Sequence, residues 1–347
     1  MKIPLSILDL SPIDSGISSG QALQNTIKLA QLADRLGYTR YWLAEHHNTD
    51  MLASSAPEIM IAHVAQATTR IRVGSGGVML PNHSPLKVAE MFRVLESLHP
   101  GRIDLGIGRA PGTDPRTALA LRRSREALAA DDFPEQLAEL FAFVGERGGF
   151  PEGHPFRTVK ASPDDVPLPP LWLLGSSDYS AQAAGELGIG FAFAHHIQPG
   201  FALPAINLYR ARFKPSKWLE KPEVILATSV ICADTEERAE ELAASMRLAW
   251  ARLRSGRPGP IPSPEEAKAH NYTPIEQEII REYATRQTVG SPSAVKEKLL
   301  ALQEETGADE LMLMAPVYGY ENRVRAYELL AQAFDLPVAE GSSASLS

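Results

Sequence analysis

The stretch LSPIDSGISSG at residues 10–20 decides between two folds that the rest of the 347-residue chain allows. It follows a short apolar run at residues 4–10, and a helical pattern begins directly after it. A doubly wound sheet that binds a dinucleotide carries a GxGxxG turn at this point. This spacing is absent from residues 10–20, so we expect the alternative, a closed (β/α)8 barrel.

Eight candidate strands follow one another along the chain, and each is apolar on both faces, as is typical of strands covered on both sides. They occupy residues 4–10, 41–44, 71–75, 103–108, 171–174, 190–194, 224–231 and 310–314. Helical patterns lie between them, at residues 21–36, 86–98, 180–187, 235–253, 292–305 and 321–334. The alternation predicts a parallel sheet. We expect one TIM barrel domain over residues 1–336 and a disordered, small and polar tail at 337–347.

Two connections are too long for simple crossovers and predict insertions after strands 4 and 7. Residues 110–170 contain helical patterns near 116–130 and 134–146. Residues 254–289 include SGRPGPIPSP, whose prolines and glycines indicate a loop. Such an insertion either decorates the surface or forms a lid, since it leaves a strand end where barrel active sites lie.

Composition excludes several classes of protein. The formal net charge is −8 and no block of Lys or Arg occurs, so a nucleic-acid partner is not expected. The one cysteine, Cys232, excludes an internal disulfide framework and suits a reducing cytoplasm. The N-terminal apolar run is too short for a signal peptide, and no stretch approaches the roughly 20 apolar residues of a membrane span. We therefore expect a cytoplasmic protein without a membrane partner.

The segment WLAEHHN at residues 42–48 runs from a buried strand directly into polar residues. Histidine titrates near neutral pH and suits general-base chemistry, which makes His46 a candidate catalytic residue. Adjacent side chains on a strand point to opposite faces, so His46 and His47 are not expected to share a metal, and no metal site is predicted. The alternative is that the histidines only cap the strand through hydrogen bonds.

Two other strands end in residues that could hold a ligand. Gly76 and Gly77 end the third strand and let the backbone approach a flat ligand closely, although a tight turn would explain them equally. Arg109 stands just past the fourth strand in GRIDLGIGRAPG. It could bind an anion through charge-assisted hydrogen bonds, or form a salt bridge across the rim.

Serines gather where the fifth strand meets a helix, in WLLGSSDYSAQAAGELG at residues 172–188. Ser176, Ser177 and Ser180 at a helix N-terminus are typical of a phosphate site, and the alternative for Ser177 is ordinary N-capping. Two more histidines follow the sixth strand in FAFAHH at residues 191–196. One of these two histidines could line the pocket, and either could instead cap the next helix.

Together these segments resemble one known family. SILDLSPI, YWLAEHHN, VGSGGVMLPNHSPLKVAE, PGRIDLGIGRAPGTD, LWLLGSSDYSAQAAGELG and VGSPSAVKEKLLALQEETGADELMLM are similar, in order and spacing, to the bacterial luciferase-like flavin monooxygenases. The branch most resembled is that of uncharacterised luciferase-like oxidoreductases. The resemblance implies a (β/α)8 barrel, usually a homodimer. It also implies reduced FMN as co-substrate, supplied by a separate NAD(P)H:flavin reductase, and use of O2 to oxygenate a small organic substrate.

The resemblance also assigns roles to residues. It implies that His46 is catalytic, that Arg109 contacts the flavin phosphate and that the run Ser176, Ser177 and Ser180 completes the phosphate site. It places a cis peptide at Gly76–Gly77 beside the flavin ring.

Three positions depart from the luciferase pattern. Gly108 replaces a reactive cysteine, Gly175 a glutamate and Tyr179 a threonine, so light emission is not expected. Two alternatives stay open, a deazaflavin-dependent hydride-transfer oxidoreductase and a non-catalytic flavin-binding protein.

Overall fold

Eight parallel strands pair side by side and close on themselves, because β10 pairs with both β8 and β1. The computed structural model describes residues 3–337. The barrel strands are β1 (Leu5–Asp9), β2 (Arg40–Leu43), β3 (Arg72–Ser75), β5 (Ile103–Gly108), β6 (Leu171–Gly175), β7 (Gly190–Ala194), β8 (Val224–Cys232) and β10 (Glu310–Met314). The predicted (β/α)8 barrel is confirmed, and each predicted strand is found within a residue of its expected bounds.

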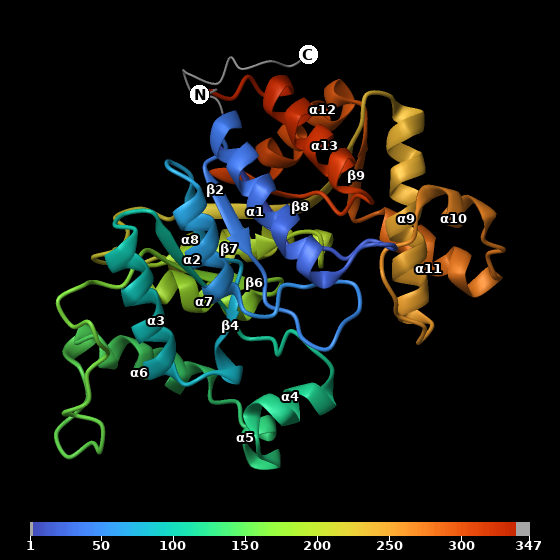
Figure 1. Cartoon of the computed structure of the whole chain (residues 1–347). Coiled ribbons are helices and arrows are strands. Elements are labelled where there is room, and N and C mark those ends of the chain that lie inside the picture. Colours follow the sequence, from blue (N-terminus) through green and yellow to red (C-terminus); the bar gives the residue numbers. More distant parts are fainter. Residues whose placement is uncertain (1–2, 338–347) are drawn as a thin grey trace.

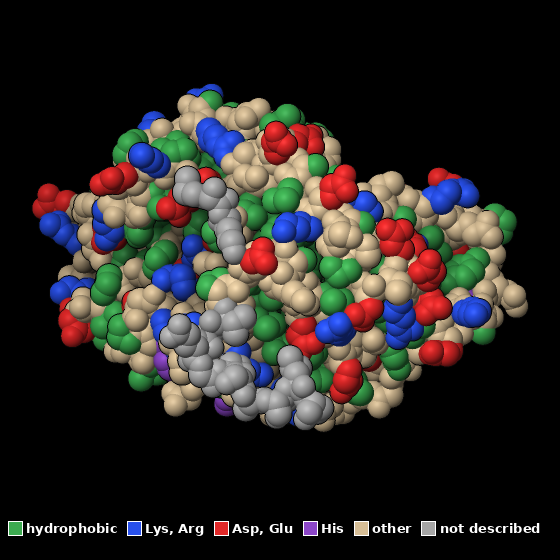
Figure 2. All heavy atoms as spheres, turned by 90° about the horizontal axis from the view of Figure 1, so that it is seen from above, with side chains coloured by type: hydrophobic (Ala, Val, Ile, Leu, Met, Phe, Trp, Pro, Cys, Tyr) green, Lys and Arg blue, Asp and Glu red, His purple; other side chains and the backbone are tan. Residues whose placement is uncertain are grey.

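Helices surround this barrel (Figure 1). Those between the strands are α1 (Ser19–Leu36), α2 (Pro57–Ala67), α3 (Pro85–Leu98), α7 (Asp178–Leu187), α8 (Ala202–Arg212), α9 (Glu236–Arg254), α12 (Pro292–Thr306) and α13 (Tyr320–Ala333). The sequence had not indicated α2 and α8. Of the expected disordered tail, residues 338–347 lie outside the described residues. Figure 2 shows Lys and Arg side chains interspersed with Asp and Glu over the face seen from above, which therefore offers no continuous basic patch.

Both predicted insertions exist. The first contains α4 (Pro115–Arg122), α5 (Arg125–Ala129) and α6 (Phe133–Phe143); the single helix expected near 116–130 is broken at Arg123, whose backbone is left-handed. The second differs from the expected loop. Most of its SGRPGPIPSP segment is irregular, and the insertion continues as α10 (Pro264–Ala269), α11 (Pro274–Ala284) and the short strand β9 (Gln287–Gly290), which pairs with β8. Pro264 and Pro274 begin helices here instead of breaking them, because a first-turn proline loses no helical hydrogen bond.

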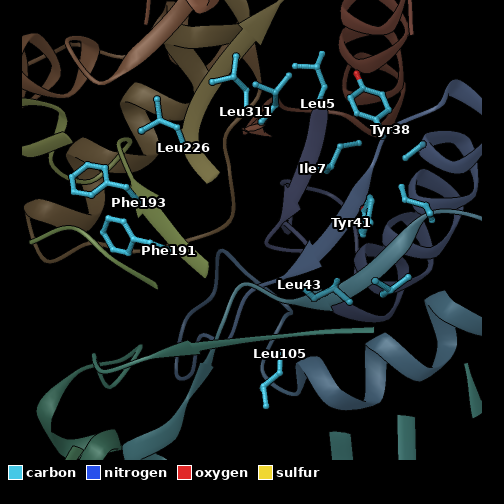
Figure 3. Close-up of a cluster of buried hydrophobic side chains, with 14 of the residues drawn as sticks. Leu5, Ile7, Tyr38, Tyr41, Leu43, Leu105, Phe191, Phe193, Leu226 and Leu311 are labelled. Atoms are coloured by element: carbon cyan, nitrogen blue, oxygen red, sulfur yellow. The ribbon is translucent and has the colours of Figure 1, made fainter. Parts of the chain in front are cut away.

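The outward faces of the strands bury apolar side chains against the helices (Figure 3). Leu5, Ile7 and Leu43 alternate with residues that face the barrel interior. The interior cluster contains Leu8 and Trp42, among others. This alternation follows from the two-residue period of a strand, and it produces two apolar layers from one set of strands.

A charged network fills the floor of the barrel. Asp104, fully buried on β5, accepts hydrogen bonds from Arg40 at 2.9 Å, Arg72 at 2.6 Å and the indole of Trp42 at 3.1 Å. Arg40 also pairs with Glu310 at 3.0 Å. Above this floor the rings of Trp42 and Trp172 meet edge to face, with centroids 5.7 Å apart. These side chains close the N-terminal end, so a ligand can enter only where the strands end.

Replacing Asp104 with alanine should lower the free energy of unfolding by about 3–5 kcal/mol, because the partly buried Arg72 would lose its carboxylate partner and Arg40 would keep only Glu310. Urea unfolding followed by circular dichroism measures this loss. Asp234→Ala is the matched control. Asp234 also pairs with an arginine, Arg325, at 2.6 Å, but on the surface, where such a pair contributes less than about 1 kcal/mol. Equal effects of the two substitutions would contradict a structural role for the floor network.

Candidate active site

Glu45 and His46 follow the end of β2 and have different environments. Glu45 is fully buried and its carboxylate accepts hydrogen bonds from His47 at 2.8 Å, His83 at 2.9 Å and the backbone N–H of Met79 at 2.8 Å. Burial alone would raise the pKa of Glu45, but the hydrogen bonds from His83 and His47 bring it below its ordinary value. Glu45 therefore holds three segments of the rim together. Sequence reasoning had assigned it no role, because its burial depends on distant residues.

His46 has the opposite environment. Its Nδ1 is buried and has no hydrogen-bond partner within residues 3–337. Burial lowers the pKa of His46 to about 4; Glu45 opposes this shift, while His47 and His196 reinforce it. The imidazole is therefore neutral at physiological pH, and its Nδ1 is unpartnered among the described residues. This arrangement differs from that of His47, whose Nε2 is engaged by Glu45.

A second histidine stands across the barrel from His46. In the closed strand order β7 lies opposite β2, and His196 follows the end of β7. His196 hydrogen-bonds through Nδ1 to the carbonyl of Ala227 at 3.0 Å. Its neighbour His195 instead contacts the hydroxyl of Thr228 at 3.3 Å. His196 is close enough to His46 for its charge to lower the pKa of His46.

Two glycines shape the wall beside His46. The Gly76–Gly77 peptide bond is cis, as predicted. A Cβ on Gly76 would lie 2.7 Å from Leu8 Cδ1, and one on Gly77 would lie 2.9 Å from the carbonyl oxygen of Gly106. A side chain at Gly77 would clash with the backbone, and one at Gly76 would require Leu8 to move, so this part of the wall is formed by the backbone.

Arg109 and the serine run meet at the neighbouring ends of β5 and β6. The Arg109 guanidinium lies over the ring of Tyr179, 4.3 Å from its centroid, and forms no salt bridge within residues 3–337. The alternative of a rim salt bridge is therefore not supported. Tyr179, where the family pattern has a threonine, instead orients the arginine through a cation–π contact.

The serines occupy different positions around the start of α7. Ser177 is the N-cap residue, yet its hydroxyl makes no capping hydrogen bond, and Ser176 is half-buried. Ser180 is buried beside Gly175, where a Cβ would lie 2.4 Å from the Ser180 hydroxyl. Gly175 is thus required by the position of Ser180. The glutamate of the luciferase pattern would not fit here with Ser180 in this place.

Hydrogen bonds join the histidine segment to the arginine segment. The backbone N–H of His47 donates to the carbonyl of Gly112 at 3.2 Å, and the Thr113 hydroxyl donates to the carbonyl of His47 at 3.0 Å. Asn48 donates to Asp114 at 2.9 Å. The loops that carry His46 and Arg109 therefore form one continuous rim, which their separation of more than 60 residues along the chain does not reveal.

The insertion after β8 rests on this rim. Backbone hydrogen bonds join Ile261 to Ile13 at 2.9 Å and to Ser15 at 2.8 Å, in the loop after β1. Ile261 also packs in an apolar cluster with Met51, from the loop after β2, and with Tyr283 of α11. The insertion thus lies at the C-terminal end of the barrel, which favours the lid interpretation over surface decoration.

The barrel interior has the chemistry to receive a polar aromatic ligand. Besides His46 Nδ1, the Trp172 indole nitrogen and the Ser229 hydroxyl are buried without a partner in the described part of the chain. No group of three His, Cys, Asp or Glu side chains within residues 3–337 is arranged to hold a metal.

A separate groove of about 570 Å³ lies between α1 and α13, lined by Lys28, Arg35 and Tyr320 among others. None of the predicted site residues lines it. We therefore place the candidate site at the mouth, where barrel active sites lie.

Comparison with known proteins agrees with this geometry. The family model described as luciferase-like monooxygenase matches residues 3–310. The chain belongs to this family. It is 44% identical over 327 residues to the luciferase-like monooxygenase of Escherichia coli K12, covering 94% of this chain and 96% of that one. It is also 37% identical over 339 residues to the N-acetyl-S-alkylcysteine monooxygenase of Bacillus subtilis, covering 95% and 98%.

Solved structures of luciferase-like proteins share the barrel. The apo-MsnO8 crystal structure superposes with a TM-score of 0.87 at 39% identity, over 97% of this chain and 99% of that one. Two barrels under 25% identical share the fold alone. One is the oxygenating constituent of 3,6-diketocamphane monooxygenase of Pseudomonas putida in complex with FMN, with a TM-score of 0.69. The other is an F420-dependent secondary alcohol dehydrogenase, with a TM-score of 0.68. Among the described helices, none is long and apolar enough to cross a membrane.

The buried position of His46 predicts an unusual titration. Since its pKa falls to about 4, it should stay mostly neutral at pH 5, whereas histidines of the denatured chain protonate near pH 6.5. NMR of histidine-labelled protein measures this directly, with His46→Gln identifying the signal.

The shift also has a consequence for stability. Between about pH 6.5 and 4 the unfolded state binds a proton at His46 that the folded state does not, so the stability contributed by this residue falls as the pH falls through that window. A His46 signal that titrates near pH 6.5 in the folded protein would contradict the buried, neutral assignment.

Proposed function

We propose that this protein is a monooxygenase that uses reduced FMN and O2 to oxygenate a small organic substrate. One observation carries the proposal. A free guanidinium at Arg109, a side-chain-free wall at Gly76–Gly77 and a neutral imidazole at His46 surround a single barrel mouth. These would serve as an anion site, a surface for a flat ring and a proton-exchanging group, which together would bind and orient a flavin.

The phosphate of FMN would be held by Arg109 and the start of α7. Ser177 offers a hydroxyl that makes no capping bond, and the free backbone N–H groups of the first helical turn favour an anion. Ser176 and Ser180 are the further candidates for this contact. The ring of Tyr179 holds the guanidinium over the site, which lowers the conformational entropy lost when the phosphate binds.

The flavin ring would lie against Gly76–Gly77, inside a mouth lined mainly by apolar side chains. Bound reduced flavin supplies the electrons that activate O2, and an apolar site protects reactive species from water. His46 would accept or deliver a proton at its unpartnered Nδ1. The organic substrate would enter from the side covered by the insertion after β8.

Relatives support FMN over a deazaflavin. The relative at 37% identity is named a monooxygenase, whereas the F420-dependent neighbour is 12% identical and shares the fold alone. A relative that is 28% identical over 312 residues is named the oxygenase component of a flavin-dependent trigonelline monooxygenase. We accordingly propose that a separate NAD(P)H:flavin reductase supplies the reduced flavin here.

We also propose a homodimer formed through α2 and α3, which are adjacent in the helix layer (Figure 1). Their outer faces leave large apolar side chains exposed: Ile59 by 58%, Val94 by 46% and Leu98 by 65%. Val94 and Leu98 are four residues apart and lie on one side of α3. An apolar stripe of this kind favours contact with a second copy.

Arg109→Ala should weaken binding of reduced FMN by about 1.5–3 kcal/mol, the range for hydrogen bonds to a charged group. Riboflavin, which lacks the phosphate, should bind wild type and variant about equally. Anaerobic fluorescence titration measures both affinities, and Arg125→Ala, an exposed arginine on the same insertion, is the control. If riboflavin loses as much affinity as FMN, the phosphate assignment is wrong.

His46→Ala should reduce reductase-coupled oxygenation by about 100-fold or more while leaving FMN affinity largely intact, as expected for the loss of a general base. Incorporation of ¹⁸O from O2, measured over a panel of aldehydes, ketones and thioethers, reports the reaction. His47→Ala should cost less, or act through loss of its contact with Glu45. Unchanged turnover in His46→Ala would remove this residue from the catalytic site.

The double variant Val94→Glu/Leu98→Glu should sediment as a monomer at concentrations where the wild type is a dimer, because two carboxylates would be desolvated in the interface. Sedimentation velocity tests this. Ile275→Glu on α11, where isoleucine is 72% exposed, should leave the dimer unchanged. A wild type that is monomeric throughout would refute the proposed dimer.

A further inference from the structure

We propose that His196 determines substrate specificity, and that it selects an uncharged substrate carrying an O–H or N–H group. This inference rests on the proposed function and concerns the same mouth. His196 Nε2 would accept the hydrogen bond from that group. Nothing in the family comparison assigns a role to this residue.

The backbone fixes the tautomer of His196. Both the N–H of its own backbone and its Nδ1 lie within hydrogen-bond distance of the Ala227 carbonyl, at 3.3 and 3.0 Å. A carbonyl only accepts, so Nδ1 must carry the proton. In the neutral ring Nε2 is then an acceptor and cannot donate. The hydrogen bond that His196 makes within residues 3–337 uses Nδ1 and not Nε2, and the residue is only partly buried, which leaves Nε2 available to a ligand.

Burial favours the neutral ring and lowers the pKa of His196. The groups facing it are also uncharged near neutral pH, since burial lowers the pKa of His46 to about 4 and also lowers that of His195. The acceptor character of Nε2 therefore persists at physiological pH. An acceptor held in this way discriminates against a ligand without a donor, because such a ligand would displace water from Nε2 and leave this nitrogen unpaired.

Within residues 3–337, the cluster of side chains that fills the barrel interior above the floor contains no charged residue. This cluster consists of Leu8, Trp42, Ala44, Trp172, Ala192, Ile225, Ala227, Met312 and Met314, with Leu10 and Leu174 packed against it. Asp104 and Glu310 belong to the floor and are neutralised there by arginines. An ionised substrate would thus lose its hydration without gaining a counter-ion, whereas a neutral one would not.

A second polar atom supports this location for the substrate. The Ser229 hydroxyl is buried without a partner on β8, two residues after Ala227. The ends of β7 and β8 therefore form a wall with two free polar groups. Arg109 follows β5, and Gly76–Gly77 follows β3. In the proposed function both bind the flavin. A ligand held by His196 and one held by Arg109 would occupy different sides of the mouth.

The test uses 1-octanol and its methyl ether, a pair that differs in the hydroxyl donor. Isothermal titration calorimetry on the full chain, with and without FMN, gives the dissociation constant of each. Replacing His196 with leucine should weaken the binding of 1-octanol about three- to tenfold, which corresponds to the loss of one hydrogen bond. The affinity for the ether should stay nearly unchanged. His196→Gln, which places an amide near the position of Nε2, should recover part of the loss. Octanoate should bind wild type more weakly than 1-octanol.

His195→Leu is the matched control, because His195 faces Thr228 and should leave both ligands unaffected. Three results would overturn the inference. His196→Leu could lose affinity for the alcohol and the ether equally, or it could lose affinity for FMN. The wild type could also fail to bind either probe. The proposed function is tested separately. If the alcohol-to-ether pattern holds but FMN neither binds nor supports oxygenation, the proposed function fails while the assignment of His196 stands.

Discussion

The buried carboxylate of Asp104 is the constraint on which the rest of the barrel depends. It accepts hydrogen bonds from two arginines and from Trp42, and through Arg40 it is linked to Glu310 on β10. Four strands of the closed sheet are tied together in this way. The network also orients the Trp42 indole, which packs against Trp172 above it. Because the floor is filled, the space for a ligand lies at the C-terminal ends of the strands.

The mouth combines a rigid rim with an interior that holds free polar atoms. Glu45 shows how the rim is built, since one buried carboxylate binds His47, His83 and the backbone N–H of Met79 in β4 (Val78–Met79). His46 is the next residue, yet it keeps an unpartnered nitrogen. Structural support and a candidate chemical group therefore come from adjacent residues just after β2. Preorganised polar groups in an apolar site favour catalysis, because little reorganisation is needed during the reaction.

Much of the fold could be predicted from the sequence because each barrel strand is a short apolar run with its own boundaries. The positions of Arg109, Gly76 and Gly77 could be predicted for the same reason, since each follows such a run. The roles of Glu45, Tyr179 and His196 could not. The role of Glu45 depends on its contacts with His83 and Met79, and that of Tyr179 depends on the placement of Arg109. The role of His196 depends on its contact with the carbonyl of Ala227. These contacts form only when separate strands are brought together. The prolines after β8 were misleading because they begin helices there.

The central claim is that this mouth binds reduced FMN, and the choice of cofactor tests it most directly. Anaerobic equilibrium dialysis of the full chain against reduced FMN and, separately, reduced F420 would compare the two cofactors under identical conditions. The account predicts saturable binding of FMN and much weaker binding of F420. Tight binding of F420 with no measurable binding of reduced FMN would contradict the account, because the mouth would then serve hydride transfer without oxygen.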